Sequence, residues 1–375
     1  MARCGTVLLM QLLLQRLYQR LAYEYAEIKR MPAETLVAMH RTARISSIGA
    51  STRIENAVLT DAEVNWIDTV LTADAKLTAF DTHRRLIENK LSKDRERSIE
   101  EVAGCREMLH LIYEQGAELY PLTETTIRGL HASLMRHFKQ AGPYVGRYKG
   151  VFNSVIEHNK ATGETRTVFE TASPGPITEA AMRDCLHWYN ERIKTRSFGF
   201  EVVCQFVLRF LAIHPFQDGN GRLGRGLFLL ALLQSHEESL AGLAPYLGID
   251  RQIERHRAEY YLVLNQCSQG RFSADPDLYN FEPFVRFMIK MLNLALDGIQ
   301  MSLEHFKKVR NLSESATKVL DCFKEHPEIR LTMSLILQET KLARRTTGHA
   351  LLQLVSLGLI QKYGQGAGVR YQLVF

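Results

Sequence analysis

Two apolar runs separated by a short polar loop constrain this chain more strongly than any other feature of its sequence. The first run covers residues 202–213 and the second covers residues 227–233, and neither contains glycine or proline. Both are too long and too apolar for surface loops, so we expect two buried helices. The loop between them, HPFQDGNGRLGR at residues 214–225, carries a base, a carboxylate, three glycines and two arginines. Because a packed core disfavours such residues, the loop predicts a functional site.

The composition limits the class of protein. A length of 375 residues allows two or three domains, and 46% hydrophobic residues are ordinary for a globular protein. The net charge of +6 permits nucleic acid or ATP as a partner but requires neither. No segment has the ~18–20 continuous apolar residues of a membrane span. Six cysteines without a C-x-x-C pair favour reduced thiols, and the apolar stretch at residues 7–14 breaks at Gln11, which disfavours a signal peptide. We therefore expect a cytoplasmic protein.

Helical periodicity dominates the chain and predicts a mainly α fold. We expect two helices within residues 6–45, interrupted at Pro32, and then a polar helix boundary at residues 46–56. Later helices are expected from Ala62 onward and over residues 100–118, 123–138, 178–192, 251–266 and 281–303, with Asp61, Thr123 and Thr178 as N-caps.

One β-hairpin interrupts the helices. Apolar pairs at residues 151–152 and 155–156 precede a turn at residues 159–163, and a strand at residues 165–169 follows it. Two such runs on either side of a short turn that contains Asn and Gly are typical of a hairpin.

The C-terminal region has a different pattern, typical of a winged helix. Lys341, Arg344 and Arg345 stand where a DNA-binding winged helix carries its contacts. Winged helices also bind proteins or form dimers, so DNA and a homodimer both stay open as partners. The expected elements are helices at residues 313–323, 331–339 and 343–356, followed by a two-stranded wing at residues 359–363 and 369–373.

The glycines of the loop fit two common nucleotide-binding motifs poorly. Gly219-x-Gly221-x-x-Gly224 matches the dinucleotide fingerprint, but that fingerprint follows a β-strand in a βαβ unit, and here both flanks are helical. No Gly-Lys-Ser/Thr sequence closes the loop, as a P-loop requires. If the loop had no function, this segment would be a helix-loop-helix core with a buried histidine and surface arginines.

The residue types of the loop suit an anion-binding site. Gly219, Asn220 and Gly221 allow backbone N–H groups to converge at the start of the next helix. Arg222 and Arg225 add guanidinium groups that can bind phosphate through two hydrogen bonds each.

Two further residues complete a phosphate-transfer site. Asp218 would repel phosphates unless a cation lies between them, and Mg²⁺ binds in this way through a carboxylate and phosphate oxygens. His214, one short loop away, can accept a proton near neutral pH. The loop therefore predicts a base, a metal ligand and an anion site together.

These residues also resemble a known family. HPFQDGNGRLGR is similar to the Fic motif, H-x-F-x-[D/E]-G-N-G-R-x-x-R, at every fixed position, and the layout of helices around one hairpin is similar over most of residues 110–300. The resemblance implies a Fic-type helical core that transfers AMP from ATP to a hydroxyl group of a protein Ser, Thr or Tyr, with release of pyrophosphate. The implied roles are His214 as base, Phe216 as core anchor, Asp218 as Mg²⁺ ligand, Gly219, Asn220, Gly221, Arg222 and Gly224 as the phosphate-binding set, and Arg225 as the contact of the γ-phosphate.

The resemblance places two further groups of contacts. Residues 149–152 (Lys149, Gly150, Val151 and Phe152) lie where the family has a flap that binds a target segment by strand addition. Tyr260 lies where relatives have an aromatic residue near the adenine, and Tyr261 competes for that place.

A second motif implies autoinhibition. Residues 51–56, STRIEN, resemble the Fic inhibitory motif [S/T]-x-x-x-E-[G/N]. In such proteins the glutamate pairs with the second motif arginine, so Glu55, in the motif that Ser51 begins, would pair with Arg225. One guanidinium group cannot bind a carboxylate and a phosphate together, so the pair would block ATP. Without the Fic motif, an exposed glutamate would be the simpler interpretation.

The sequence therefore predicts an autoinhibited protein adenylyltransferase that uses ATP and Mg²⁺ and acts on a protein substrate, which includes itself as a candidate. The alternatives are a DNA-binding transcriptional regulator with the core as a nucleotide sensor, and an enzyme that removes AMP or transfers another phosphate-containing group. The expected domains are an N-terminal helical region at residues 1–110 with the inhibitory motif at 51–56, a Fic catalytic core at 111–305 and a winged helix at 311–375.

Overall fold

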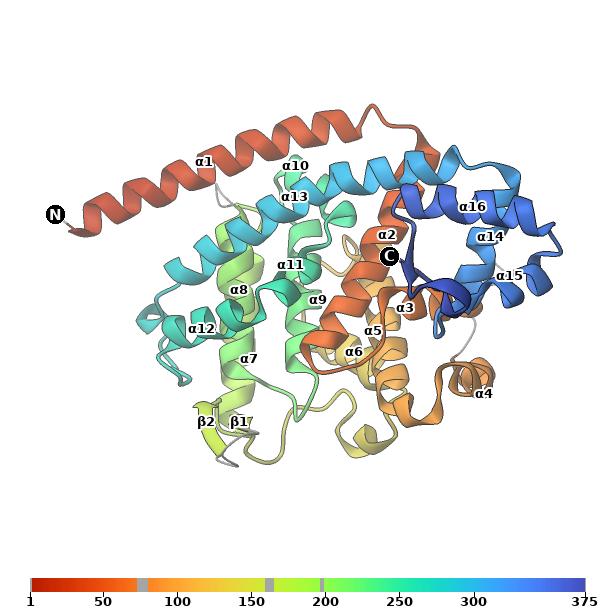
Figure 1. The fold of residues 1–375 in the computed structure, drawn as a ribbon. Coiled ribbons are helices and arrows are strands. Elements are labelled where there is room, and N and C mark those ends of the chain that lie inside the picture. The colour runs from red at the N-terminus through yellow and green to blue at the C-terminus, as the bar shows by residue number, and fades with distance from the viewer. Residues whose placement is uncertain (1, 73–79, 159–164, 196–198, 375) are drawn as a thin grey trace. The chain divides into compact units, whose positions relative to one another are not determined.

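The computed structural model describes residues 2–72, 80–158, 165–195 and 199–374, and most of these are helical (Figure 1). The prediction of a mainly α fold is confirmed. The chain divides into two compact units, the first formed by residues 1–57 and 100–299 and the second by residues 58–99 and 300–375. This grouping cuts across the three sequential domains expected from the sequence, whose boundaries stay a prediction.

The first unit is built from helices with one hairpin. Helix α5 begins four residues before the second segment of the unit, at Glu96, and helix α13 continues eleven residues beyond the unit, to Arg310. Its elements are α1 (Ala2–Ile28), α2 (Ala33–Ile54), α5 (Glu96–Gln115), α6 (Glu124–Met135), η2 (Lys139–Tyr144), β1 (Val155–His158), β2 (Thr165–Phe169), α7 (Pro176–Arg192), α8 (Gly199–Ile213), α9 (Asn220–Leu233), α10 (Glu238–Leu243), η3 (Ala244–Tyr246), α11 (Ile249–Arg255), α12 (Arg257–Ser268), η4 (Pro276–Leu278) and α13 (Glu282–Arg310).

Helices α8 and α9 are the two apolar runs of the sequence, and they form the centre of this unit side by side (Figure 1). Nearly every side chain of α8 and of α9 is buried, including Phe206, Phe210 and Leu230. The expectation of two buried helices is confirmed. Helix α7 packs on α8, and the C-terminal end of α2 reaches α9.

Helix α2 differs from the sequence-based expectation. The polar stretch expected to end a helix at residues 46–56 continues the helix to Ile54, and residues 45–52 are all buried. The reason is that its small residues pack closely on α11 and that the hydroxyl groups of Ser51 and Thr52 find partners. The Thr52 hydroxyl donates to the carbonyl of Ile48 at 2.9 Å, and that of Ser51 accepts a hydrogen bond from Arg225.

Other predicted helix ends need small corrections. Helix α7 begins after Gly175, and Thr178 lies inside it and donates to the carbonyl of Ser173 rather than capping the helix. The helix expected at residues 251–266 is two helices that meet at His256. Thr123 caps α6 as predicted, by accepting from the Thr126 N–H.

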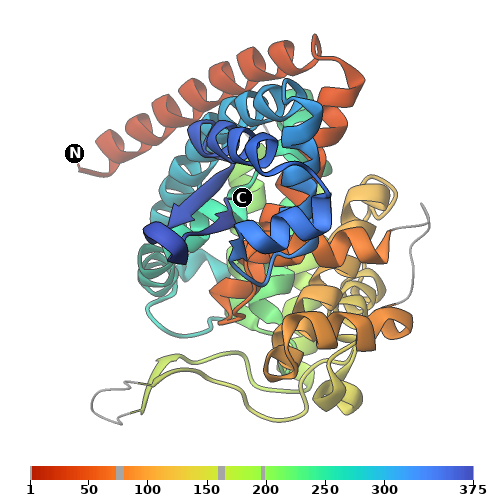
Figure 2. The same cartoon turned by 45° about the vertical axis from the view of Figure 1, so that its right-hand side comes forward.

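The hairpin has the predicted antiparallel pairing, with Val155 opposite Phe169 and His158 opposite Thr165. Its first strand begins at Val155, so residues 151–152 precede the strand. The turn expected at residues 159–163 lies outside the described residues. Both views show the hairpin at the end of the helical unit, away from α13 (Figure 2).

The second unit has its own apolar core, which includes Phe323, Leu354 and Ile360. Strand β3 lies at residues predicted as helix, because Thr332 ends the strand and caps the helix that follows. The sheet therefore has three strands in the order β3-β5-β4 instead of two. The cap of α3 is Thr60, which forms a capping box with Glu63, rather than Asp61. The elements are α3 (Asp61–Leu71), α4 (Phe80–Leu91), η1 (Lys93–Arg95), α14 (Glu314–Glu325), β3 (Leu331–Thr332), α15 (Met333–Thr340), α16 (Arg344–Ser356), β4 (Ile360–Tyr363), η5 (Gly366–Gly368) and β5 (Arg370–Leu373).

Two global properties follow from the described residues. Among them, no helix is long and apolar enough to cross a membrane. The cysteines at 105, 185, 204, 267 and 322 are buried and unpaired within the described part of the chain.

Candidate active site

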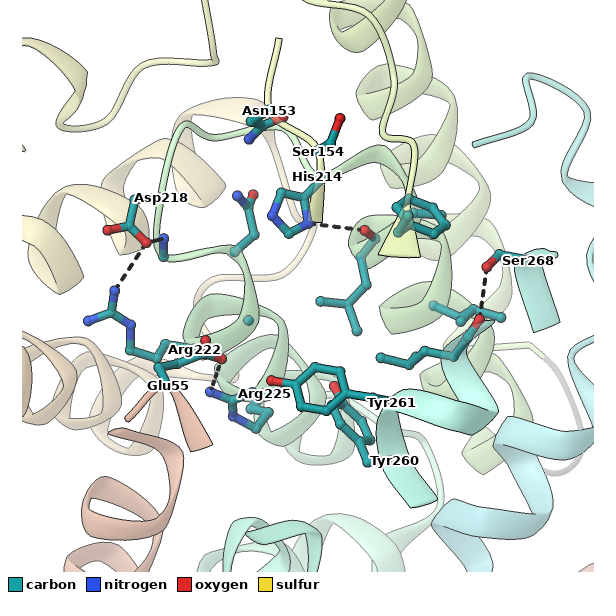
Figure 3. Close-up of a pocket in the computed structure, with 18 of the residues that line it drawn as sticks. Glu55, Asn153, Ser154, His214, Asp218, Arg222, Arg225, Tyr260, Tyr261 and Ser268 are labelled. Atoms are coloured by element: carbon teal, nitrogen blue, oxygen red, sulfur yellow. Dashed lines mark hydrogen bonds and ion pairs between the residues drawn. The ribbon is translucent and has the colours of Figure 1, made fainter. Parts of the chain in front are cut away.

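The residues predicted to act together surround one cavity of about 270 Å³ in the first unit. Charged residues gather on one side of it and tyrosines on another (Figure 3). The cavity is lined by Glu55, His214, Asp218, Gly219, Asn220, Gly221, Arg222, Arg225, Tyr260 and Tyr261, among other residues.

The central loop, residues 214–219, leaves α8 and turns into α9 in a fixed conformation. The Asn220 side chain accepts from the Phe216 N–H at 2.9 Å and donates to the Phe216 carbonyl at 2.7 Å. The Phe216 ring is fully buried and stacks on His131 with 3.8 Å between ring centroids. Gly219 has a positive φ of 79°, which glycine adopts without strain. The loop is therefore anchored by Phe216, as expected, and the side chain of Asn220 holds the loop rather than pointing at an anion.

His214 is held as a neutral base. Its Nδ1 lies 3.3 Å from the Leu211 carbonyl, which can only accept, so we infer that Nδ1 carries the proton and Nε2 is free. Burial and the nearby Lys149 charge lower the pKa of His214 to about 4. At neutral pH the imidazole can therefore accept a proton from a hydroxyl group.

The first turn of α9 has free N–H groups of the kind that bind an anion. The first backbone bond of this helix runs from the Leu223 N–H to the Gly219 carbonyl, so the N–H groups of residues 220–222 face out of the helix end. The buried Arg222 guanidinium group lies 3.4 Å from Asp218 Oδ1 and 3.7 Å from Glu101 Oε1. Gly224 is not in the cavity lining; a Cβ there would lie 2.7 Å from Leu211, so this glycine serves the contact between α8 and α9.

Asp218 is the residue that suits a divalent cation. Its half-exposed carboxylate lines the cavity, and its Oδ1 accepts from the Gly219 N–H. No group of three or more His, Cys, Asp or Glu side chains among the described residues could hold a metal by itself. One carboxylate fits Mg²⁺ that takes its other ligands from phosphate and water.

Three hydrogen bonds connect Arg225 to the C-terminal end of helix α2. Its Nη2 donates to Glu55 Oε1 at 2.9 Å and to the Ser51 carbonyl at 2.8 Å, and its Nε donates to the Ser51 hydroxyl at 2.8 Å. Although burial favours the neutral carboxyl, the Arg225 charge holds the pKa of Glu55 below its usual range. Gly221 permits this arrangement, because a Cβ there would overlap the Glu55 carboxylate.

Asp250 is a further partner of Arg225 that the sequence did not indicate. Its Oδ1 lies 3.7 Å from Arg225 Nε, and the hydroxyl groups of Ser47 and Ser51 hydrogen-bond to the carboxylate. Burial raises the pKa of Asp250. An aspartate in the first turn of a short helix looks like an ordinary helix-dipole residue, so no sequence signal identified it.

The flap residues separate into two groups. Gly150, Val151 and Phe152 are exposed, with 58% of the surface of each of the last two accessible. Lys149 contradicts the expectation of a target contact, because it is buried and its amino group is hydrogen-bonded inside the protein. Asn153 and Ser154, which the sequence analysis did not single out, line the cavity instead.

Both tyrosines considered as contacts of the adenine ring lie at the cavity. Tyr260 is buried and packs near Phe284 and Phe287, whereas Tyr261 is half-buried, with 5.5 Å between the centroids of the two tyrosine rings. An apolar wall of leucines from α8 and α12 continues this side of the cavity: Leu208, Leu211 and Leu264.

Comparisons with known proteins identify related sequences. Residues 121–232 match the model of the Fic/DOC family. The chain is 31% identical over 144 residues to the ribonucleoside-diphosphate reductase small chain of Ostreid herpesvirus 1 (isolate France), and 29% identical over 122 residues to protein adenylyltransferase fic-1 of Caenorhabditis elegans. These matches cover 36% and 32% of this chain but only 23% and 20% of the two relatives, so the chain spans about a fifth of their length.

Solved structures with Fic domains share the fold. A Fic family protein from Desulfovibrio desulfuricans G20 has a TM-score of 0.52 at 23% identity over 96% of both chains. A fragment of Fic-1 from C. elegans has a TM-score of 0.56 at 17% identity over 81% of this chain and 76% of that chain. At these identities the likeness concerns the fold alone.

Proposed function

This chain is a Fic family protein, and on that premise we propose that it transfers AMP from ATP to a hydroxyl side chain of a protein. The observation that carries the proposal is the central loop: a neutral His214 at one end of it and, at the other, the anion site of α9 with Arg222. A base and an anion site around one cavity fit nucleotidyl transfer.

The proposed reaction assigns each residue a step. His214 Nε2 accepts the proton of the target hydroxyl, whose oxygen forms a bond to the α-phosphorus while the bond to the bridging oxygen breaks and pyrophosphate leaves. The α9 N–H groups and Arg222 hold the phosphate charge, and Tyr260 or Tyr261 contacts the adenine. Mg²⁺ bound through Asp218 would neutralise charge on the phosphates.

We propose that Glu55 keeps this activity low. ATP would need Arg225 for its γ-phosphate, and in this structure Ser51 and Glu55 accept hydrogen bonds from Nε and Nη2 of that guanidinium group. A ligand phosphate must therefore displace a buried ion pair before it can bind productively.

The experiment is intact-mass spectrometry after incubation with ATP and Mg²⁺. Glu55→Gly should gain the mass of AMP on itself or on an added protein target, wild type should gain much less, and Glu55→Gly/His214→Ala should gain none. Equal labelling of wild type and Glu55→Gly would refute autoinhibition. AMP transfer that persists without His214 would refute the assigned base.

The exposed residues beside the cavity support a protein as the second substrate. Val151 and Phe152 offer apolar surface directly before Asn153 and Ser154, which line the cavity. An extended target segment that lies there would bring its hydroxyl to His214. We expect this protein to work in the cytoplasm, in keeping with the five cysteines whose side chains the structure describes, which are unpaired and buried.

Glu55 also supports the reverse reaction, removal of AMP from a modified protein. Its carboxylate lies in the cavity with about a third of its side chain exposed, where it can orient an attacking water. Wild type should then release AMP from a protein modified by Glu55→Gly, and Glu55→Gly should not. If neither releases AMP, this second activity is absent.

The C-terminal unit supports DNA binding as a separate candidate function. Lys341, Arg344 and Arg345 are exposed at the start of α16, and Lys362 and Arg370 are exposed on the wing strands. Duplex DNA should bind at low salt and dissociate steeply as salt rises, and Arg344→Ala/Arg345→Ala should weaken binding. Absence of binding at low salt would leave a protein partner or a homodimer, which light scattering distinguishes.

A further inference from the structure

Lys149 is a buried lysine whose amino group uses its three donors inside the protein. Nζ donates to Asn153 Oδ1 at 2.9 Å, to the Thr171 hydroxyl at 2.8 Å and to the Ile213 carbonyl at 3.3 Å. The residue is only 2% exposed. The last of these bonds reaches the residue directly before His214.

The backbone of the same segment holds the other side of His214. The Lys149 N–H donates to the Pro215 carbonyl at 2.8 Å, and Tyr148 forms an antiparallel bridge with Phe216. The carbonyl groups that precede and follow His214 are therefore both bound by one residue. His214 itself has a positive φ of 52°, an unfavourable conformation that such contacts can maintain.

Two neighbours complete what we call the lysine hub, defined as Lys149, Asn153 and Thr171. Asn153 Nδ2 donates to the Phe216 carbonyl at 2.7 Å, and the Thr171 hydroxyl donates to the Asn153 carbonyl at 2.6 Å. Asn153 and Thr171 lie on the segments that lead into β1 and out of β2. The hub thus connects both ends of the hairpin to the central loop.

Burial of this lysine is energetically costly. The hydrogen-bond partners of Nζ are neutral oxygens, and burial lowers the pKa of Lys149 to about 8. For stability alone, an apolar side chain of similar length would serve at least as well. A role in function explains why a cation lies here.

We propose that Lys149 is a positioning residue that fixes the backbone on both sides of His214 and couples the hairpin to the catalytic loop. The ammonium group holds the loop in place through its hydrogen bonds. Through its charge, it also keeps the imidazole of His214 unprotonated. The inference rests on the proposed role of His214 as the base. It assigns Lys149 to the loop rather than to the target protein.

The charges that face His214 make the electrostatic part testable. Burial and Lys149 lower the pKa of His214, whereas Glu55 and Asp218 raise it. Removal of the Lys149 charge should therefore raise this pKa, and removal of a neutral hub member should leave it unchanged.

The experiment compares variants of the full-length protein in the active Glu55→Gly background. Lys149→Met should lower kcat by about 10- to 100-fold with little change in KM for ATP, because loop geometry is lost while the nucleotide contacts remain. The pKa of His214, followed by NMR of its ring in the absence of ATP, should rise. Thr171→Val should also lower kcat, but with an unchanged His214 pKa, because the ammonium group stays.

Lys149→Arg and Lys290→Met serve as controls. Lys149→Arg keeps the positive charge, so the pKa of His214 should stay low in this variant. If Lys149→Met does not fold, Lys149→Arg still tests the effect of the charge. Lys290 is a half-exposed lysine on α13 that pairs with Glu259, and its loss should change neither kcat nor the pKa. A Lys149→Met protein with unchanged kcat and unchanged His214 pKa would overturn the proposal. If no variant, including the Glu55→Gly parent, transfers AMP but the pKa of His214 still rises in Lys149→Met, the proposed function is refuted. The proposed effect of the lysine hub on His214 is then still supported.

Discussion

Four oxygen atoms lie around the guanidinium group of Arg225, and they come from three residues. Ser51 supplies two of them, Glu55 one and Asp250 one. The carboxylates raise the pKa of Arg225 even though burial alone would lower it. At the scale of single residues, the regulation we propose depends on how strongly this set holds the arginine.

Ser51→Ala should activate the protein partially. It removes one hydrogen bond to a charged donor, which contributes about 1.5–3 kcal/mol, and leaves the Ser51 carbonyl and Glu55 in place. The initial rate of AMP incorporation should lie between those of wild type and Glu55→Gly. Thr52→Val is the matched control, because its hydroxyl bonds only within α2; if it activates as much as Ser51→Ala, the specific contact is not responsible.

His131 should make the protein sensitive to acid. Its Nδ1 accepts from the Gly146 N–H at 3.0 Å and its Nε2 lies 3.1 Å from the Asp218 carbonyl, so the ring must be neutral. Burial lowers its pKa to about 4 from the ordinary 6.5, so its contribution is complete above pH 6.5 and is lost as pH falls toward 4.

Urea unfolding between pH 4 and 7 measures this effect. As the pH falls, wild type should lose more unfolding free energy per pH unit than His131→Phe. The difference should reach up to about 1.4 kcal/mol per pH unit, the value for one bound proton. Equal slopes in the two proteins would show that His131 takes up its proton at the same pH in the folded and unfolded states, which would contradict the lowered pKa.

At this scale the sequence predicted residues inside motifs and missed those outside them. His214, Arg225 and Glu55 stand in recognisable patterns, and the structure brings them to one cavity. Asp250 and Thr171 are single polar residues without a pattern. The inward orientation of Lys149 depends on tertiary contacts that no local signal encodes.

Close approach of helices α5 and α6 sets the position of His131 beneath the loop. A Cβ on Gly104 of α5 would overlap the Leu134 carbonyl of α6, which is backbone and cannot turn away. At the scale of elements, this contact determines how α6 supports the stack of His131 on Phe216.

Gly104→Ala should therefore lower the unfolding free energy by about 3 kcal/mol, the upper range for overpacking a tight contact. Gly129 lies within α6 with no atom within 4 Å of the site of a Cβ, so Gly129→Ala should stabilise the protein by about 0.5–1 kcal/mol. Chemical denaturation measures both. If Gly104→Ala leaves the unfolding free energy unchanged, α5 and α6 are not in close contact at this position.

Helices were predicted well where apolar periodicity is strong and less well where polar residues are buried. Helices α8 and α9 were recognised because almost every side chain is apolar. The end of α2 differs from the prediction because serine residues usually mark a helix boundary, and only the partners Arg225 and Asp250 explain the burial of Ser47 and Ser51. Strand β3 has two residues, too few for an alternating pattern.

At the scale of the whole molecule, the Fic core and the mainly α fold followed from the sequence, but the grouping of segments did not. Residues 58–99 belong with the C-terminal residues in one compact unit, and Lys90 of α4 lies 3.3 Å from Glu328. Sequence patterns group residues that are adjacent along the chain, so they place residues 58–99 in the N-terminal region. Contacts between distant segments carry no local signal.

We propose that the cavity around His214 transfers the nucleotidyl group of ATP and that Glu55 restrains this activity. A direct measurement incubates wild type, Glu55→Gly and Glu55→Gly/His214→Ala with Mg²⁺ and ATP labelled at either the α- or the γ-phosphate. Protein-bound α-label is expected in Glu55→Gly, with little in wild type, none without His214, and no γ-label in any of the three proteins. Protein-bound γ-label, or equal α-label in all three proteins, would contradict it.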